Sequence, residues 1–170
     1  MAPLIPNLVL TQTQPDTIRT GLEALVPLTQ RGDTATATIA SSKLSHYDPM
    51  VRIAALDLLR IAAVPEQLSA VGRCLGDLNP RVREQAAKTL AACGRPGVDL
   101  AKASLDSDQT DVVNAAITAI GLVRTRYASN ALFDCLAPSY AQLTQTRQWQ
   151  AQIPPDAPNW EALRVAIAAN

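Results

Sequence analysis

Two stretches of the sequence, DPMVRIAALDLL (48–59) and NPRVREQAAKTL (79–90), align residue for residue, one repeat apart. Each begins with Asp48 or Asn79, whose side chain can accept hydrogen bonds from the first free N–H groups of a helix. Each then places proline at the first helical position, where a missing N–H is harmless. The same local rules therefore predict the same helix twice.

Two weaker copies extend this register, TDVVNAAITAIG (110–121) after it and PDTIRTGLEALV (15–26) before it. A second series of helices is indicated by one leucine per repeat, with small or apolar residues four and five positions earlier on the same helical face. A constant period of about 30 residues is typical of helical repeat proteins. The leucines follow one another at a nearly constant step: Leu44, Leu75, Leu105 and Leu136.

The predicted fold class is all-α: an α-solenoid, wound as a right-handed superhelix, of about four helix pairs plus C-terminal helices. Short connections make neighbouring helices antiparallel, and stacking buries the apolar face that one pair cannot cover alone. The solenoid is expected to occupy 1–137, with pairs at about 15–45, 48–76, 79–106 and 110–137. The first helices of the pairs are expected near 15–29, 48–62, 79–93 and 110–125, and the second near 33–45, 65–76, 97–106 and 128–137.

The tail, 138–170, departs from the repeat. A Pro-rich linker at 153–158 excludes helix and separates a polar helix from a last amphipathic one. In that last helix Trp160, Leu163 and Ile167 share one face. Two interpretations stay open: the C-terminal helices cap the open end of the solenoid, or they dock on a partner.

The composition excludes several other classes of protein. The chain has formal net charge zero, 48% hydrophobic and 4% aromatic residues, which favours closely packed helices over an aromatic-rich β-sandwich. No apolar run is long enough to span a bilayer and the N-terminus lacks a signal-peptide pattern, so membrane insertion is not expected. The cysteines have neither metal-ligand nor disulfide spacing, which favours reduced thiols in a cytoplasmic protein: Cys74, Cys93 and Cys135.

The motif Asp/Asn-Pro-x-Val-Arg-x-x-Ala-Ala/Leu-x-x-Leu resembles HEAT repeats, and more specifically the short HEAT-like repeats of the phycobilisome (bilin) lyase type. The stretch 77–94 shows the resemblance best. The resemblance implies that the motif arginine bonds to the neighbouring repeat. That role would fall to Arg52, Arg83 and, in the first copy, Arg19, whereas the fourth copy has Val113 at this position.

The sequence contains no familiar catalytic or metal-binding motif: no Gly-rich phosphate loop, H-E-x-x-H, C-x-x-C or G-x-S-x-G. The single histidine, His46, has no second histidine and no cysteine near it in the sequence and is interpreted as a turn residue. We therefore predict no catalytic residue and no metal site, and favour a role other than that of an enzyme. The residues that would bind a cofactor stay unidentified, and no cofactor is expected unless the resemblance extends to a bilin.

The candidate binding surface lies on the second helices, which usually line the concave face of a HEAT stack. Residues 72–102 have six basic and three acidic side chains, which favours a partner with an acidic patch. Phe133, the only phenylalanine, is either additional core or an exposed anchor. The candidate residues are Ser42, Ser69, Arg73, Asp99, Lys102, Asn130, Phe133 and Asp134.

Three functions follow from this surface and the resemblance. The favoured one is a non-catalytic scaffold that binds another protein, for instance a phycobiliprotein or a second HEAT-like chain. The alternative is a subunit of a phycobiliprotein bilin lyase, or a phycobilisome-associated factor, since some proteins of this type attach or remove bilins within a heteromeric lyase. DNA binding is a minor alternative, because a nucleic-acid groove needs more positive charge and stacking aromatic side chains.

Overall fold

The computed structural model describes Val9, residues 11–132 and Asp134, and the secondary structure there is helical. Three short 3-10 helices are η1 (Val26–Leu28), η2 (Pro65–Gln67) and η3 (Cys74–Gly76). A further helical segment at 126–132 ends the described solenoid. The α-helices are α2 (Pro15–Leu25), α3 (Thr34–Ser41), α4 (Pro49–Ala62), α5 (Leu68–Arg73), α6 (Pro80–Ala92), α7 (Arg95–Ala103) and α8 (Thr110–Leu122).

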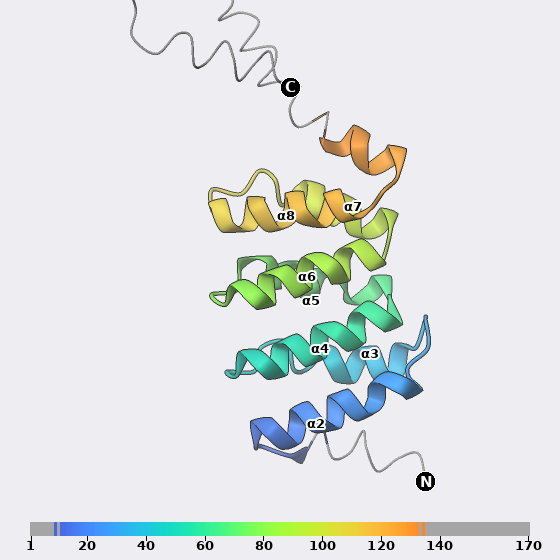
Figure 1. The fold of residues 1–170 in the computed structure, drawn as a ribbon, viewed down its shortest axis with the longest axis vertical. Coiled ribbons are helices and arrows are strands. Elements are labelled where there is room, and N and C mark those ends of the chain that lie inside the picture. Colours follow the sequence, from blue (N-terminus) through green and yellow to red (C-terminus); the bar gives the residue numbers. More distant parts are fainter. Residues whose placement is uncertain (1–8, 10, 133, 135–170) are drawn as a thin grey trace, which may run out of the picture. The chain divides into compact units, whose positions relative to one another are not determined.

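Two layers of helices form an all-α solenoid (Figure 1). The A layer consists of α2, α4, α6 and α8, which stack on one another in that order. The B layer consists of α3, α5 and α7. Within it α3 packs against α4, α5 against α6 and α7, and α7 against both α6 and α8. Each B helix therefore contacts the A helix that follows it in the sequence, which ties successive repeats together.

The N-terminal ends of α4 and α6 are stabilised by the residues that the repeat places there. Asp48 Oδ1 accepts a hydrogen bond from the backbone N–H of Met50 at 2.7 Å. Asn79 Oδ1 accepts the equivalent bond from Arg81 at 2.9 Å. A proline follows each cap at the first helical position. Both helices consequently start at equivalent positions of the repeat.

The core between the layers consists of alanine and branched aliphatic side chains. Of the matched leucines, Leu44 and Leu75 are buried, Leu105 is half-buried and Leu136 lies outside the described residues. The largest fully buried side chains come from several repeats: Ile18, Leu22, Leu56, Leu58, Leu75, Leu90 and Ile120. Small alanines between them let the helices approach closely, as the aromatic-poor composition requires.

The two layers approach each other closely between α6 and α7. A Cβ atom at Gly97 would lie 1.9 Å from the carbonyl oxygen of Leu90, so a side chain cannot fit there without moving backbone. Gly94, with φ of +66°, precedes α7 and turns the chain from the A layer into the B layer. These two glycines together set the geometry of this connection.

The segment 65–76 differs from the single helix expected there. It is divided into η2, the six-residue α5 and η3. Pro65 has no N–H to donate at the start, and Gly76 has low helix propensity at the end, so tighter 3-10 turns form at both ends. Gly72 lies where Leu100 of α7 packs: a Cβ there would be 2.8 Å from Leu100 Cδ2.

The chain divides into two compact units, Met1–Phe133 and Asp134–Asn170. The first unit contains the solenoid. The C-terminal helices and Pro-rich linker expected at 138–170 lie outside the described residues. Among the helices that the structure does describe, none is both long enough and apolar enough to cross a bilayer.

Candidate functional site

Arg52 joins two successive repeats through a nearly buried ion pair with Asp77. Arg52 Nε lies 2.8 Å from Asp77 Oδ2, and Arg52 Nη2 lies 2.8 Å from Asp77 Oδ1. Arg52 Nη1 donates to the carbonyl oxygens of His46 and Tyr47 at 2.7 and 3.0 Å. The two charged side chains are only 13% and 12% exposed. One guanidinium therefore holds its own preceding loop and the next repeat in place.

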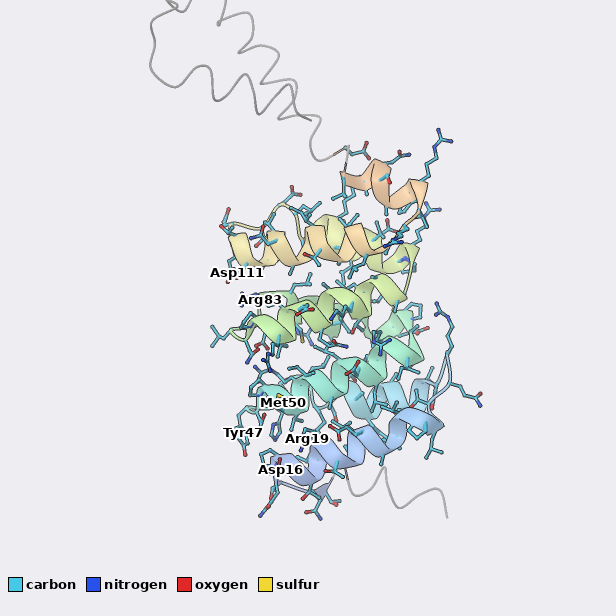
Figure 2. The ribbon with its side chains drawn as sticks, viewed as in Figure 1. Asp16, Arg19, Tyr47, Met50, Arg83 and Asp111 are labelled. Atoms are coloured by element: carbon cyan, nitrogen blue, oxygen red, sulfur yellow. The ribbon has the colours of Figure 1, made fainter. Side chains whose placement is uncertain are left out.

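Arg83 repeats this arrangement at the next interface with a more exposed partner. Its Nη1 donates to the carbonyl oxygens of Asp77 and Leu78 at 2.8 and 3.3 Å. These two carbonyls are equivalent, one repeat later, to the carbonyls that accept from Arg52. Its Nη2 lies 3.3 Å from Asp111 Oδ2 on α8, and the Asp111 side chain is 67% exposed (Figure 2). Arg52 and Arg83 thus both bond to the neighbouring repeat.

Arg19 does not form the bond to the next repeat that the motif implied. It donates to Glu23 at 3.0 Å and lies 3.6 Å from Asp16, both on its own helix α2. The residue that matches Asp77 one repeat earlier is His46, which has no carboxylate to pair with an arginine. His46 Nδ1 instead accepts the backbone N–H of Asp48 at 3.1 Å. The series of arginine bridges therefore begins at α4.

Asp77 is the structural residue that the sequence reasoning missed. Besides binding Arg52, its Oδ1 accepts the backbone N–H of Asn79 at 2.8 Å, which orders the turn before α6. The sequence feature that could have pointed to Asp77 is its position, just before the helix cap Asn79 and one repeat after His46. Nothing in the sequence, however, indicates that the acidic side chain turns back toward the preceding repeat.

Two further polar contacts join α4 to α6. Gln85 Nε2 donates to Asp57 Oδ1 at 2.7 Å. The buried hydroxyl of Thr89 lies 3.0 Å from the carbonyl oxygen of Leu56 and 2.8 Å from that of Gln85. These contacts, with the Arg52–Asp77 pair, make α4–α6 the most extensively hydrogen-bonded A-layer interface among the described residues.

Of the predicted partner-binding positions, Ser42 directly follows α3, Ser69 and Arg73 lie on α5, Asp99 and Lys102 lie on α7, and Asn130 lies on the helical segment 126–132. Lys102 is half-buried. The Phe133 side chain lies outside the described residues, so its assignment as additional core or as an exposed anchor stays a prediction. Asp134, the first residue of the second unit, is exposed. The exposed positions within the solenoid are Ser42, Ser69, Arg73, Asp99 and Asn130.

Tyr127 links α7 to the last described helical segment. Its hydroxyl donates to Asp99 Oδ1 on α7. The guanidinium carbon of Arg95 lies 4.5 Å from the centroid of its ring, in cation–π contact. Tyr127, with Arg95 against its ring, therefore contacts Asp99, one of the predicted binding residues. The sequence reasoning missed both, because their proximity arises only when the helices stack.

The cysteine thiols of the solenoid are held in their protonated form. Burial raises the pKa of Cys74 to about 11, and the negative charge of Asp77 acts in the same direction. Burial also raises the pKa of Cys93. A protonated thiol is a poor nucleophile and metal ligand. In the part of the chain that the structure describes, no cluster of three or more His, Cys, Asp or Glu side chains is arranged to hold a metal ion.

A family model for HEAT repeats matches residues 37–121, half of the 170-residue chain. The chain belongs to the HEAT-repeat family. The matched HEAT region runs from α3 through most of α8 and includes both interfaces that Arg52 and Arg83 bridge. No curated protein matches the sequence.

Two crystal structures of engineered proteins from the Northeast Structural Genomics Consortium are similar to this HEAT-repeat chain. One is 20% identical with a TM-score of 0.49, and the match covers 76% of this chain and 67% of the engineered one. The other is 21% identical with a TM-score of 0.46, and the match covers 76% of this chain and 40% of the engineered one. The HEAT assignment itself rests on the family model and on the helical stack.

Proposed function

We propose that this HEAT-repeat chain is a non-catalytic scaffold that binds another protein along its B layer, the face that HEAT stacks usually make concave. One observation supports this most directly. Exposed polar side chains project from consecutive B helices, with Ser42 after α3, Ser69 and Arg73 on α5, and Asp99 on α7. A row of this kind offers directional contacts to a partner that lies along several repeats.

The stack suits this role because its repeats are held in fixed register. The Arg52–Asp77 pair and the close contact at Gly97 leave little freedom between neighbouring helices. Exposed side chains on such a support are preorganised, so a partner does not have to order them on binding. The surplus of basic residues in 72–102 favours a partner that presents an acidic patch.

Arg73→Glu tests the proposal, because Arg73 is exposed and basic and lies in the middle of the B layer. Wild type and variant are used for affinity purification from native lysate, with bound proteins quantified by mass spectrometry. The variant should lose the wild-type partner while circular dichroism shows the same helix content. Arg81→Glu, at an exposed arginine of α6 in the A layer, is the matched control and should retain the partner. Equal retention by Arg73→Glu would show that the partner binds elsewhere.

The resemblance of 77–94 to repeats of the bilin lyase type supports a second candidate, a subunit of a phycobiliprotein lyase or a phycobilisome-associated factor. The reacting thiol would then belong to the phycobiliprotein, so the scaffold needs no nucleophile of its own. Co-expression with a phycobiliprotein and a bilin, followed by in-gel fluorescence, tests this candidate. If no fluorescent adduct forms and the phycobiliprotein does not co-purify, this candidate is rejected.

A further inference from the structure

The interfaces of the A layer are unequally filled. Between α4 and α6, Gln85 reaches across to Asp57. Ala54 occupies the equivalent position of α4, one repeat earlier, and has no polar group that could hydrogen-bond to α2. In the described structure no side-chain hydrogen bond or ion pair joins α2 to α4, since Arg19 bonds only within α2. A groove of about 400 Å³ lies between these two helices as a result.

The floor of this groove is apolar and accessible. Val26 and Ile53 are half-buried against the core, and Ile61 and Ala54 line the groove beside them. Met50, which lines the groove near the N-terminus of α4, is 46% exposed. The volume falls within the range of about 300–1,000 Å³ that is usual for ligand pockets. A ligand that covers Met50 and Ile53 would remove apolar surface from water, which is favourable.

The rim of the groove is electrically balanced. On α2, Arg19 pairs with Glu23 at 3.0 Å. On α4, Arg60 pairs with Asp57 at 3.2 Å. Two basic and two acidic side chains therefore line the groove, each paired on its own helix. A charged ligand gains no net electrostatic complementarity from such a rim, so an uncharged apolar stripe is favoured as long as it covers the floor and leaves the ion pairs of the rim in water.

The groove between α6 and α8 provides an internal comparison. It also arises where an alanine, Ala115, replaces the glutamine of α6. Its lining is polar, however, with Arg83 and Glu84 on α6 and Asn114 and Thr118 on α8. An apolar ligand would desolvate these groups without pairing them. Of the two grooves, only the one between α2 and α4 suits an apolar ligand.

We propose that the α2–α4 groove is a second docking site, which takes an amphipathic helix of a partner protein with an uncharged apolar stripe about three turns long. The residues of α4 that line it recur at helical spacing from Met50 to Ile61, a length of about 16 Å. An apolar face of that length is the surface that helix-in-groove recognition uses. Arg19 on α2 and Met50 on α4, which both line the groove, lie at the same edge of the stack (Figure 2). This site is on the A layer and is independent of the B-layer scaffold function.

Methyl NMR of the full chain tests the site directly, because Met50 is one of only two methionines. With ¹³C-methyl methionine labelling, Met1 and Met50 give the two probe signals. The probe is a synthetic helix of about 15 residues with a leucine stripe and a neutral polar face. It should shift the Met50 signal in a saturable way, whereas the same peptide with alanine in place of leucine should not. No shift of the Met50 signal at about millimolar peptide would overturn the proposal.

Two variants locate the peptide. Met50→Glu places a charge in the groove at the first turn of α4, where a carboxylate favours the helix dipole, so the fold is retained. It should weaken peptide binding, measured by fluorescence anisotropy, at least about ten-fold. Ile117→Glu, at an exposed apolar residue of α8, is the control and should leave binding unchanged. Equal affinity for Met50→Glu and wild type would refute the site. A Met50 signal that shifts with protein concentration alone would make a second copy the occupant and would also refute it.

Discussion

Asp77→Ala should lower the free energy of unfolding by about 3 kcal/mol, since breaking a buried ion pair costs about 3–5 kcal/mol when one charge is left without its partner. The substitution removes two bonds from Arg52 at 2.8 Å each and the bond to the backbone N–H of Asn79. Arg52 would keep the carbonyl oxygens of His46 and Tyr47, so the lower end of that range applies.

Urea denaturation followed by circular dichroism measures this loss, with Asp111→Ala as the matched control. Asp111 binds the equivalent arginine, Arg83, through one contact at 3.3 Å, and its side chain is 67% exposed, so its removal should cost about 0.5 kcal/mol. A double-mutant cycle of Asp77→Ala with Arg52→Ala should give a coupling energy of about 2 kcal/mol. Equal losses for Asp77→Ala and Asp111→Ala, or a coupling energy near zero, would refute the reasoning that burial and two-bond geometry set the strength of these bridges.

Three further predictions concern backbone and thiol positions. Gly97→Ala should destabilise the fold by about 3 kcal/mol in thermal melts, since its Cβ would lie 1.9 Å from the Leu90 carbonyl oxygen. The control Gly121→Ala, with open space at its Cβ, should be neutral or stabilise the fold by about 0.5 kcal/mol. Ala63→Gly should raise the melting temperature, worth about 0.5–1 kcal/mol, because Ala63 has φ of +47°; an unchanged or lower value would contradict this. Because the pKa of Cys74 is raised in the folded chain, the unfolded chain loses the thiol proton at a lower pH. The free energy of unfolding should therefore fall between about pH 9 and pH 11. Urea titrations across that window should show a smaller fall for Cys74→Ala than for wild type.

The repeat and its helix caps were predictable because they depend on local chemistry. Asp48 and Asn79 cap α4 and α6 through bonds to backbone N–H groups close by in the chain. The apolar spacing that marks Leu75 as core requires only that the segment be helical, and Leu75 is fully buried. The division of 65–76 into η2, α5 and η3 was not predicted, although Pro65 and Gly76 are local signals for it. The close packing of Leu100 against Gly72 could not be predicted, because it involves the next repeat.

The candidate sites divide in the same way. Of the predicted B-layer positions Ser42, Ser69, Arg73, Asp99 and Asn130 are exposed, since exposure follows from the face of a helix that the core does not use, and their role in binding stays a prediction. The sequence did not locate the Arg95–Tyr127–Asp99 cluster or the groove between α2 and α4. Both depend on side chains from different repeats, and a period says nothing of which side chains meet across an interface.

By itself, then, the sequence determined that the chain is a stack of HEAT repeats with equivalent helix starts, because capping and periodicity act within one turn or one face of a helix. Tertiary structure alone decided which repeats are bridged. Arg52 pairs with Asp77, whereas the position that would hold the acid for Arg19 is His46, and Arg19 bonds within its own helix. That difference, with an alanine at position 54 where the next repeat has Gln85, leaves an apolar groove between α2 and α4.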